Sequence, residues 1–485
     1  MITIDAGTTR IQLSFIFLSG LLLLSVLYSC SDVVSKEAED TAPGIHVSKN
    51  NPYYWEYNGR QTMLLGGSVE DNLYQIDQLA EHLDLLASAG GNYVRNVMSC
   101  RDSGNVWPFR KLENGKYDLR HDDDEHWRRF ENFLEETANR DIIVQIEVWA
   151  TFDFYRDFWD VNPFNPRNNV NYDSRRSKLS EVVDTHPIFT ENNFFRSVPS
   201  QMALARVLEF QQKFVDKMLS YSLEYDHVLY CMDNETSVTS DWGKYWATYI
   251  RKKARLMGKE VYTTEMWDPH DLSHPFHAET FDNPEIFNFI DISQNTHQSS
   301  DHQWTNGIAQ LERLKAMGYV RPVNNVKVYG NDGGRHKTTR DAIENFIKNT
   351  LMGCAATRFH RPPTGQGLNE TAQAVIRSMR QLTGLTNFFE GMPHNDLLQS
   401  REPGEAFCRA VPDTEYVIYF PGGGEVELDL TGFKGDPELV WLNVLSSELT
   451  DKVRLDKGKI KLTAPGNDHL VALIGTLNSA YTGSL

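Results

Sequence analysis

The stretch His227-Val-Leu-Tyr-Cys-Met-Asp-Asn-Glu-Thr236 decides the fold, because an apolar run ends abruptly in Asp233, Asn234 and Glu235. A run of Val, Leu, Tyr and Cys is typical of a strand that is buried on both faces. In parallel α/β barrels the chemistry lies at the C-terminal ends of such strands. Glu235 is therefore the first candidate for a catalytic carboxylate.

Seven further strand patterns, most of them followed by a helical pattern, flank this one along the 485-residue chain. The eight expected strands cover residues 62–67, 92–98, 142–149, 227–233, 260–267, 289–293, 326–330 and 355–359. The expected helices cover 76–89, 126–138, 202–223, 242–257, 305–317, 342–352 and 372–385, with a weak helix after the fifth strand. This alternation predicts βαβ units, and eight of them predict a closed (β/α)8 barrel over residues 46–392. An open doubly wound sheet is the competing architecture, but no Gly-x-Gly-x-x-Gly follows the first strand.

The C-terminal part of the chain has a different pattern. Short alternating strands are expected at 416–420, 425–430, 439–443, 459–462 and 469–474, separated by turns rich in Gly and Pro. Such spacing is typical of a small antiparallel β-sandwich, and we expect one over residues 393–485.

The N-terminus resembles a bacterial lipoprotein signal. An apolar run from Ile11 to Leu27 follows Arg10 and ends in Leu-Tyr-Ser-Cys30. Residues 1–30 are thus expected to be a signal peptide, with Cys30 as the lipidated first residue of the mature chain. Residues 31–45, rich in Ser, Glu, Asp and Ala, would form a flexible tether, and the protein would be anchored at the cell envelope by lipid alone. An ordinary cleaved signal or a single membrane anchor is the alternative.

Composition narrows the class of function. The net charge of −18 lacks the electrostatic footprint of a nucleic-acid binder, so no nucleic-acid partner is expected. The 10 Trp, 20 Tyr and 25 Phe, many beside Asn, Asp and His, suit a carbohydrate ligand, although a large core also uses aromatic residues. The four cysteines beyond Cys30 have no metal or disulfide spacing, and no cofactor or metal is expected. His-x-His on strand one, His-Glu-x-x-His and Gly-x-Ser-x-Gly are all missing. A monomer is compatible with such a chain.

The polar residues at the C-terminal ends of the expected strands form the candidate site. Besides Glu235 and Asp332 as catalytic residues and Asp233 as an alternate, we expect substrate contacts from Arg95, Asn96, Trp149, Asn234, Glu265, Trp267, His297 and Arg358. Glycoside cleavage needs one carboxyl group to protonate the leaving oxygen and a second one to attack or to activate water. Glu235 and Asp332 are the pair whose strand positions suit this geometry, with Glu265 as the substitute nucleophile.

Asn234-Glu235 on strand four, an acid after strand seven and Arg95 on strand two resemble the layout of clan A retaining glycoside hydrolases. The resemblance implies that Glu235 is the acid/base and that the strand-seven acid is the nucleophile. This chain has Asp332, in Gly330-Asn-Asp-Gly-Gly334, where the clan has Glu. Two structural alternatives stand beside these roles: Glu235 could belong to the start of the next helix, and Asp332 could shape its own turn.

The opening Asn51-Pro-Tyr-Tyr-Trp55 and the tail Glu415-Tyr-Val-Ile-Tyr-Phe-Pro-Gly-Gly-Gly424 resemble Bacteroidota barrel enzymes with a C-terminal module labelled collagen-binding, a group that includes apiosidases. There the strand-four acid can be an Asp, which would correspond to Asp233. The hypothesis is a glycoside hydrolase, retaining in mechanism, for plant or host polysaccharides. The rival is a surface glycan-binding lipoprotein without catalysis. The aromatic loop 152–159 is expected to stack against sugars.

Overall fold

The computed structural model describes residues 43–186, 192–332 and 335–476. Ala42–Leu485 form one compact unit, which contains a parallel sheet, its helices and a group of antiparallel strands. A small antiparallel sheet, β1 (Ile45–Val47), β2 (Trp55–Tyr57) and β3 (Arg60–Thr62), precedes the barrel. The expected signal peptide, with Cys30, and most of the tether lie outside the described residues. Within the described ranges, each helix is too short or too polar to cross a membrane.

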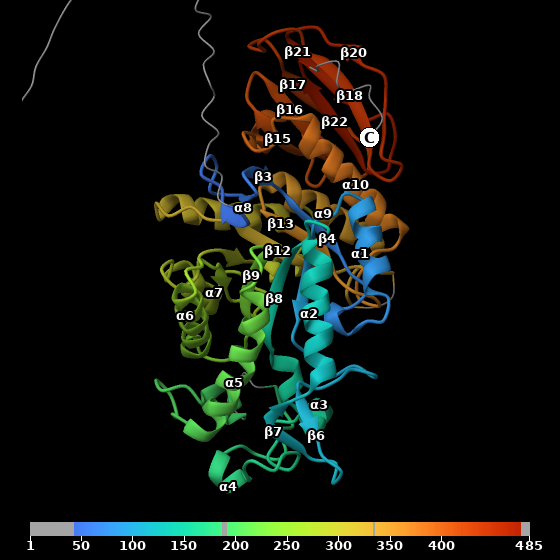
Figure 1. The fold of residues 1–485 in the computed structure, drawn as a ribbon. Helices are drawn as coiled ribbons and strands as arrows, with labels where there is room; N and C mark the ends of the chain where they lie inside the picture. The colour runs from blue at the N-terminus through green and yellow to red at the C-terminus, as the bar shows by residue number, and fades with distance from the viewer. Residues whose placement is uncertain (1–42, 187–191, 333–334, 477–485) are drawn as a thin grey trace, which may run out of the picture. The chain divides into compact units, whose positions relative to one another are not determined.

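Eight parallel strands form the barrel sheet in the order β10-β9-β8-β5-β4-β13-β12-β11 (Figure 1). Their bounds are β4 (Leu64–Gly67), β5 (Tyr93–Val97), β8 (Ile143–Ala150), β9 (Val228–Asn234), β10 (Thr263–Thr264), β11 (Ile290–Asp291), β12 (Val323–Val328) and β13 (Ala356–Phe359). The two outer strands of this order, β10 and β11, meet where the backbone N–H of Asn288 donates to the carbonyl of Thr263 at 2.9 Å. The predicted (β/α)8 barrel is confirmed.

A helix follows each barrel strand and covers the outside of the sheet. These helices are α1 (Leu79–Ser88), α2 (Asp124–Ala138), α5 (Ala205–Ser222), α6 (Ser240–Leu256), α7 (Pro275–Phe281), α8 (Ser300–Ala316), α9 (Thr339–Met352) and α10 (Glu370–Leu385). Several begin earlier than predicted because their first turn is polar and follows a capping residue. Asp123 caps α2, Asn369 caps α10, and Thr338 with Asp341 forms a capping box on α9.

Two insertions enlarge the C-terminal face of the barrel. The hairpin of β6 (Phe109–Lys111) and β7 (Tyr117–Asp122) separates β5 from α2. A longer insertion between β8 and α5 holds the short helices α3 (Arg156–Val161) and α4 (Ser174–Ser177) and the 3-10 turns η2 (Thr151–Phe154) and η4 (Asn193–Arg196). This insertion contains the aromatic loop that the sequence singled out.

The C-terminal strands form a six-stranded path, β14-β15-β16-β22-β18-β19, with β20 paired to β18 and a separate β17–β21 pair. Their bounds are β14 (Met392–Pro393), β15 (Phe407–Val411), β16 (Glu415–Phe420), β17 (Glu425–Asp429), β18 (Glu438–Asn443), β19 (Glu448–Leu449), β20 (Val453–Arg454), β21 (Lys459–Thr463) and β22 (Leu470–Gly475). All neighbours are antiparallel, and Ile418, Phe420 and Leu428 belong to a core that these strands share. The predicted β-sandwich is confirmed.

Buried Arg409 on β15 joins the sandwich to the barrel. Its guanidinium donates to the carbonyls of Leu351 at 3.1 Å and Phe388 at 2.9 Å, and to the hydroxyl of Tyr54 at 2.7 Å. We predict that Arg409→Met lowers the free energy of unfolding by about 1–3 kcal/mol, because buried acceptors then lack donors. Urea unfolding followed by fluorescence measures this loss. The control Arg454→Met, at an exposed position, should change the free energy by less than ~0.5 kcal/mol, and equal effects of the two variants would contradict the prediction.

Candidate active site

Glu235 lies directly after β9, and its carboxylate receives a hydrogen bond from the ammonium of Lys327 on β12. The same ammonium donates to Oδ1 of Asn234 at 3.2 Å, and the hydroxyl of Tyr329 lies 3.4 Å from the Glu235 carboxylate. Glu235 has φ +61°, a backbone conformation that side chains other than glycine rarely adopt. Such conformations persist where surrounding contacts hold them, and they cluster at active sites.

The ion pair controls the charge of both partners. Burial favours a neutral Glu235 carboxyl, but the charge and hydrogen bond of Lys327 outweigh burial and lower its pKa below the ordinary 4.5. Burial likewise favours neutral Lys327, but the charge of Glu235 outweighs it and raises the pKa of the ammonium. Glu235 is therefore ionised at neutral pH although it is buried, with 8% of its surface exposed.

Asp268 supplies a second carboxyl at the same end of the barrel. Burial, followed by the negative charge of Glu235, raises the pKa of Asp268 from 3.8 to about 6. The backbone connects the two acids: the N–H of Asp268 donates to the carbonyl of Thr236 at 3.0 Å, and the N–H of Thr236 donates to the carbonyl of Met266 at 2.6 Å. One acid is thus held ionised, while its neighbour is protonated mainly below about pH 6.

A network of cations fixes the bottom of the site. Asp71 contacts Arg95 on β5, Arg358 on β13 at 3.4 Å and Arg361 at 3.2 Å. Burial would raise the pKa of Asp71, but these cations hold it well below the ordinary value. Arg95 also lies 3.4 Å from Glu147, whose pKa burial raises to about 7 although Arg95 opposes the shift. Both predicted residues Arg95 and Arg358 therefore lie in the barrel, where they hold carboxylates rather than point freely into solvent.

Histidine and tyrosine rings surround the charged pair. His297 stacks on His270 with ring centroids 3.6 Å apart, and Tyr329 lies 5.4 Å from His297 and 4.4 Å from His360. On the side of the long insertion, Tyr155 packs against His186 at 5.1 Å. Burial lowers the pKa of His297 to about 3, so this ring is neutral at pH 7. The predicted His297 is therefore a neutral wall residue with its ring near Glu235.

Several predicted residues face away from this cluster. Trp149 packs against Phe214, Trp242 and Trp246 of the outer helices, and the indole of Trp267 donates to Thr280 at 2.6 Å. Both rings are almost fully buried. They offer no free face to a sugar.

Two predicted polar residues, Asn96 and Glu265, are likewise bound within the fold. Asn96 accepts the backbone N–H of Tyr74 at 3.2 Å. Glu265 receives the hydroxyl of Thr236, and its carboxylate lies so close to Gly243 on α6 that a Cβ at Gly243 would be 1.7 Å from it. Burial raises the pKa of Glu265 well above its ordinary value. A neutral carboxyl packed against a helix gives no support to its role as substitute nucleophile.

The structure also distinguishes the two acids of strand four. Asp233 is fully buried and accepts both the N–H of Thr151 at 2.9 Å and its hydroxyl at 2.7 Å. Burial raises the pKa of Asp233 to about 8. Asp233 therefore holds the chain between β8 and η2, while Glu235 is the acid that the ion pair presents at the end of the strand.

Asp332 does not join the carboxylate cluster. It is exposed, and its carboxylate accepts the backbone N–H of Thr339 at 2.9 Å, which lowers its pKa. Among the described contacts, none connects Asp332 with Glu235. The surroundings of Asp332 match the alternative in which it shapes its turn, and its role as nucleophile draws no support from them.

Three residues of the cluster were missed by sequence reasoning. Lys327 is a single charge inside the apolar run Val326-Lys-Val-Tyr329, and that isolation is a signal for an inward-facing cation. Tyr329 lies on the same run. Asp268 directly follows Trp267, the last residue of the fifth strand pattern, so its signal is an acid placed one residue beyond a predicted strand end.

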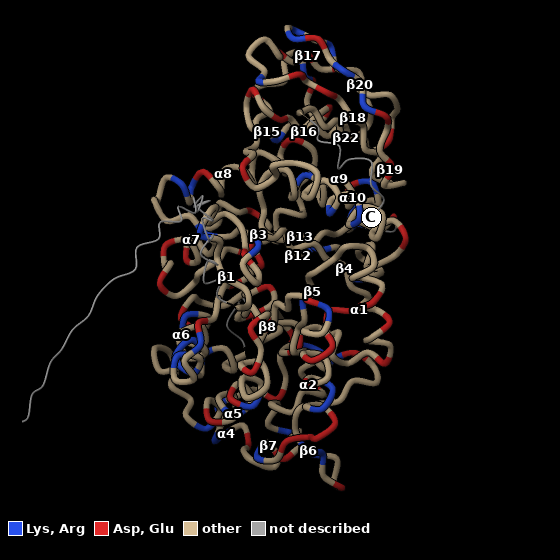
Figure 2. The backbone as a smooth tube through the Cα atoms, turned by 45° about the horizontal axis from the view of Figure 1, so that its top comes forward, with Lys and Arg blue, Asp and Glu red and all other residues tan. Residues whose placement is uncertain are grey.

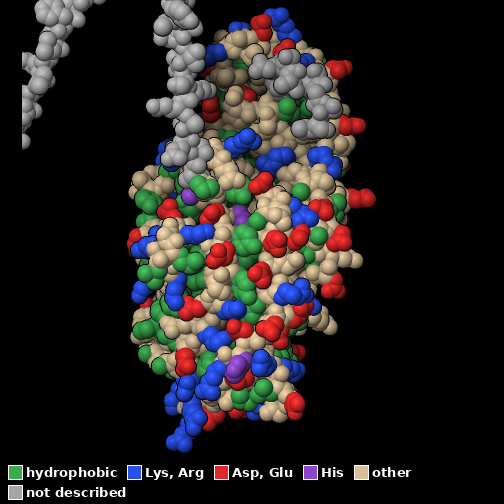
Figure 3. Space-filling view, in the orientation of Figure 1, with side chains coloured by type: hydrophobic (Ala, Val, Ile, Leu, Met, Phe, Trp, Pro, Cys, Tyr) green, Lys and Arg blue, Asp and Glu red, His purple; other side chains and the backbone are tan. Residues whose placement is uncertain are grey.

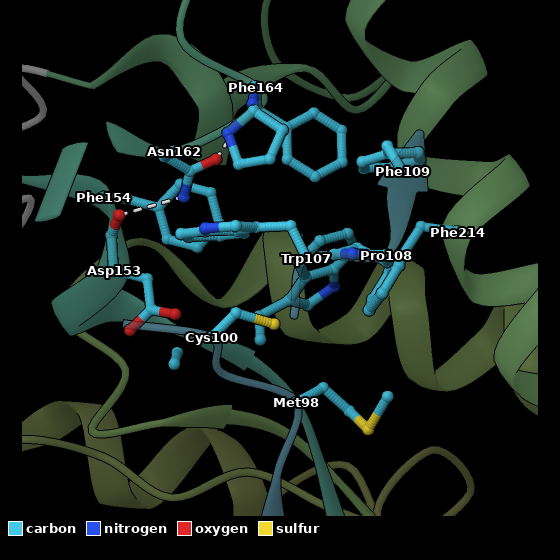
Figure 4. A pocket seen from close by; sticks show the side chains of 13 residues that line it. Met98, Cys100, Trp107, Pro108, Phe109, Asp153, Phe154, Asn162, Phe164 and Phe214 are labelled. Atoms are coloured by element: carbon cyan, nitrogen blue, oxygen red, sulfur yellow. Dashed lines mark hydrogen bonds between the residues drawn. The ribbon is translucent and has the colours of Figure 1, made fainter. Parts of the chain in front are cut away.

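A separate small cavity lies beside the barrel, lined by Met98, Cys100, Trp107, Asp153 and the ring of Phe164 (Figure 4). It encloses about 30 Å³, room for one or two water molecules but not for a sugar. The aromatic loop contributes Phe154 to its wall and Phe154 stacks on Phe194 at 4.2 Å, so much of that loop packs on its own insertion. The rings of Phe152 and Tyr155 contact His186, and His186 is close enough to Glu235 for the charge of that carboxylate to raise its pKa against the effect of burial.

Four cysteines, Cys100, Cys231, Cys354 and Cys408, are buried and free. Across the described ranges, no group of three or more His, Cys, Asp or Glu side chains is arranged to hold a metal ion. Acidic and basic side chains are interspersed over the surface in Figure 3.

Comparison with known proteins agrees with the architecture. A glycoside hydrolase family 5 protein from Bacteroides vulgatus has a TM-score of 0.62 at 12% identity, over 90% of this chain and 93% of its own. A structure described as a glycoside hydrolase has a TM-score of 0.57 at 13% identity, over 90% and 97%. The α-amylase of Geobacillus thermoleovorans has a TM-score of 0.50 at 12% identity, over 90% and 96%. No family model and no curated protein matches the sequence. The fold is therefore a (β/α)8 barrel followed by a β-sandwich, and these neighbours, which share the fold at low identity, are described as glycoside hydrolases.

Proposed function

We propose that this protein is a glycoside hydrolase that cleaves plant or host polysaccharides and oligosaccharides with two carboxyl groups. The observation that carries the proposal is the pair of Glu235 and Asp268, adjacent acids whose surroundings shift their pKa values in opposite directions. Pairs of this kind divide the acid and base roles of a reaction between them. The glycoside-hydrolase fold of the neighbours supports the same class of reaction.

The pKa values assign the roles. Asp268, protonated below about pH 6, would donate its proton to the leaving glycosidic oxygen. Glu235, held ionised by Lys327, would attack the anomeric carbon or accept the proton of a water molecule. Carboxyls about 5–5.5 Å apart give retention, and about 6.5–9.5 Å gives inversion. In this assignment Glu235 is the ionised carboxylate instead of the general acid that the sequence predicts. Asp268 takes the place of Asp332 as the second carboxyl.

The first experiment screens purified protein against oligosaccharides, with the anomer of each product read by NMR. Hydrolysis of at least one of them supports the proposal, and the first anomer formed shows whether Glu235 acts as nucleophile or base. A protein that cleaves none of a broad panel, yet binds some of its members, is instead the glycan-binding lipoprotein.

Asp268→Asn tests the acid. We predict a loss in kcat/KM of about 10²–10⁴-fold on ordinary glycosides, and loss of the fall in activity that wild type shows as pH rises through about 6. On a 2,4-dinitrophenyl glycoside the variant should retain most of its activity, since that leaving group needs no proton. Asp271→Asn, an exposed acid nearby, is the control and should behave as wild type. Equal losses on both classes of substrate would contradict the role of Asp268.

One observation favours the non-catalytic alternative. The side chain that β12 directs to Glu235 is the ammonium of Lys327, at the strand where the clan resemblance implied a carboxylate. In a binding protein without a nucleophile, Glu235 would remain as a carboxylate whose charge is balanced by Lys327. For either function we propose attachment at the cell envelope through Cys30, which mass spectrometry of the membrane fraction would show as a diacylglyceryl-modified cysteine.

A further inference from the structure

A second groove lies on the outside of the barrel, between α5 and α6. It is an open groove with a volume of about 560 Å³, within the range of ligand sites in proteins. Its lining includes Ser200, Asp241, Tyr245, Thr248, Tyr249 and Lys252. None of these residues belongs to the Glu235 cluster.

Two tyrosines of α6 form the aromatic part of this groove. The rings of Tyr245 and Tyr249 are half-buried, nearly parallel at 24°, and have centroids 6.1 Å apart. Buried Trp246 packs edge-on against both, at 5.1 and 5.6 Å. Because a packed ring loses little conformational freedom on binding, such rings are efficient contact surfaces.

The hydroxyl groups of these tyrosines are also held in place. Gln212 on α5 donates to the hydroxyl of Tyr245 at 2.6 Å, and the hydroxyl of Tyr249 donates to Asp216 at 2.8 Å. Lys253 pairs with Asp216 at 2.8 Å and lies 5.1 Å from the Tyr249 ring centre. The orientation of both rings is therefore set by helix-to-helix contacts before any ligand binds.

Polar side chains alternate with these rings along the groove. Asp241, Thr248 and Lys252 are exposed, and Figure 2 shows basic residues gathered along α6. A surface with flat apolar rings and separate hydrogen-bonding groups suits a ligand with an apolar face and a rim of hydroxyls. A sugar has that chemistry: its C–H bonds cover one face of the ring and its hydroxyls project from the edge.

The groove begins at the rim that carries the candidate active site. Ser200 lies on the insertion that follows β8, and Asp241 is in the first turn of α6, six residues after Glu235. From Asp241 to Lys252 the helix advances about 16 Å. A ligand in the groove would thus extend several sugar units from the rim along the outside of the barrel.

We propose that the α5–α6 groove binds a stretch of a polysaccharide chain and holds a polymer next to the catalytic rim. The sugar class rests on the proposed function, whereas the groove itself rests on its own geometry. Short glycosides that occupy only the rim would not reach Tyr245 and Tyr249. The groove would then lower the KM for polymers and leave hydrolysis of short substrates unchanged.

The test measures binding without turnover. In a Glu235→Gln background, affinity electrophoresis in gels that contain arabinoxylan, galactomannan, homogalacturonan or hyaluronan should show retardation by at least one polymer. Adding Tyr245→Ala and Tyr249→Ala should weaken that binding roughly tenfold or more. The matched control, Tyr245→Phe with Tyr249→Phe, keeps both rings and should retain binding. Thr248→Arg fills the groove from an exposed position and should weaken binding without removing any core contact.

The outcomes separate this proposal from the proposed function. Retardation by a polymer that disappears in the alanine and Thr248→Arg variants supports the groove, even if the wild-type protein hydrolyses nothing. Unchanged retardation in the alanine and Thr248→Arg variants, or no retardation by any of the four polymers, overturns the groove. If the protein is active, the same groove substitutions made in the wild-type protein, with Glu235 intact, should lower kcat/KM on the bound polymer while kcat/KM on an aryl glycoside stays within twofold of wild type.

Discussion

Glu235→Gln is expected to lower kcat on natural glycosides by at least about 10³-fold, because the amide can neither attack the anomeric carbon nor take a proton from water. Glutamine keeps the size of the side chain, and its carbonyl can still accept the hydrogen bond of Lys327. Oligosaccharide binding, measured by calorimetry, should therefore stay within about tenfold of wild type. A loss of turnover together with retained binding is the signature of a catalytic carboxylate.

The control for this variant is Glu279→Gln. Glu279 also pairs with a lysine, Lys244, at 2.7 Å, but at the surface of α7. Its replacement should leave kcat unchanged. Activity of Glu235→Gln within tenfold of wild type would remove Glu235 from the mechanism. In that event the buried Glu147, with a pKa of about 7, becomes the next carboxyl to replace.

Lys327→Met has the second large expected effect. A buried carboxylate that loses its cation costs about 3–5 kcal/mol of stability, and the free energy of unfolding at pH 7 should fall by that amount. The pKa of Glu235 should rise, because burial raises it and the variant lacks the charge and hydrogen bond of Lys327 that lower it. If the protein is active, the acid limb of its pH–rate profile should move to higher pH.

The pH dependence of stability gives an independent check. Because the folded-state pKa of Glu235 is below 4.5, the pair stabilises the protein above that pH, and the benefit is lost as pH falls through the folded value. The stability difference between wild type and Lys327→Met should therefore shrink below about pH 4.5. The double variant Glu235→Gln with Lys327→Met should recover most of the loss at pH 7. A double-mutant cycle of Glu279→Gln and Lys244→Met, which form an ion pair at the surface, should give a coupling free energy of less than ~1 kcal/mol.

If Lys327→Met left stability and the acid limb unchanged, the ion pair would not control Glu235. The assignment of Glu235 as the ionised partner would then be wrong, even if Glu235→Gln were inactive. The two variants thus test different statements: the first tests whether the carboxylate is needed, and the second tests why it is ionised.

Much of the fold was predictable from sequence because its main signals are local. Apolar runs such as Val228–Asp233 marked barrel strands, and Gly-rich turns marked the sandwich. The lengths of strands five and six are overestimated from the sequence: Thr263–Thr264 and Ile290–Asp291 are far shorter than their apolar patterns. The length of a paired strand depends on the hydrogen bonds that the neighbouring strand offers, which the strand's own sequence does not contain.

The candidate site was less predictable because side-chain direction is a three-dimensional property. Glu235 was found from its place at the end of a strand, and its left-handed backbone could not be read from the sequence. Trp149 has the same place on its own strand, yet it packs on outer helices. The clan resemblance predicts the partner of Glu235 after strand seven, whereas strand seven carries Lys327 and the neighbouring acid is Asp268.

The two backbone hydrogen bonds of Thr236, one to Met266 and one from Asp268, have a further consequence. They clamp the chain just after β9 to the chain just after β10, so both acids are attached to one short bridge. The gap between their carboxyls is therefore set by this bridge and not by how tightly the barrel closes between β10 and β11. Mutations that loosen the closure would alter stability, whereas the stereochemical course of the proposed hydrolysis would change only if the Thr236 bridge itself were broken.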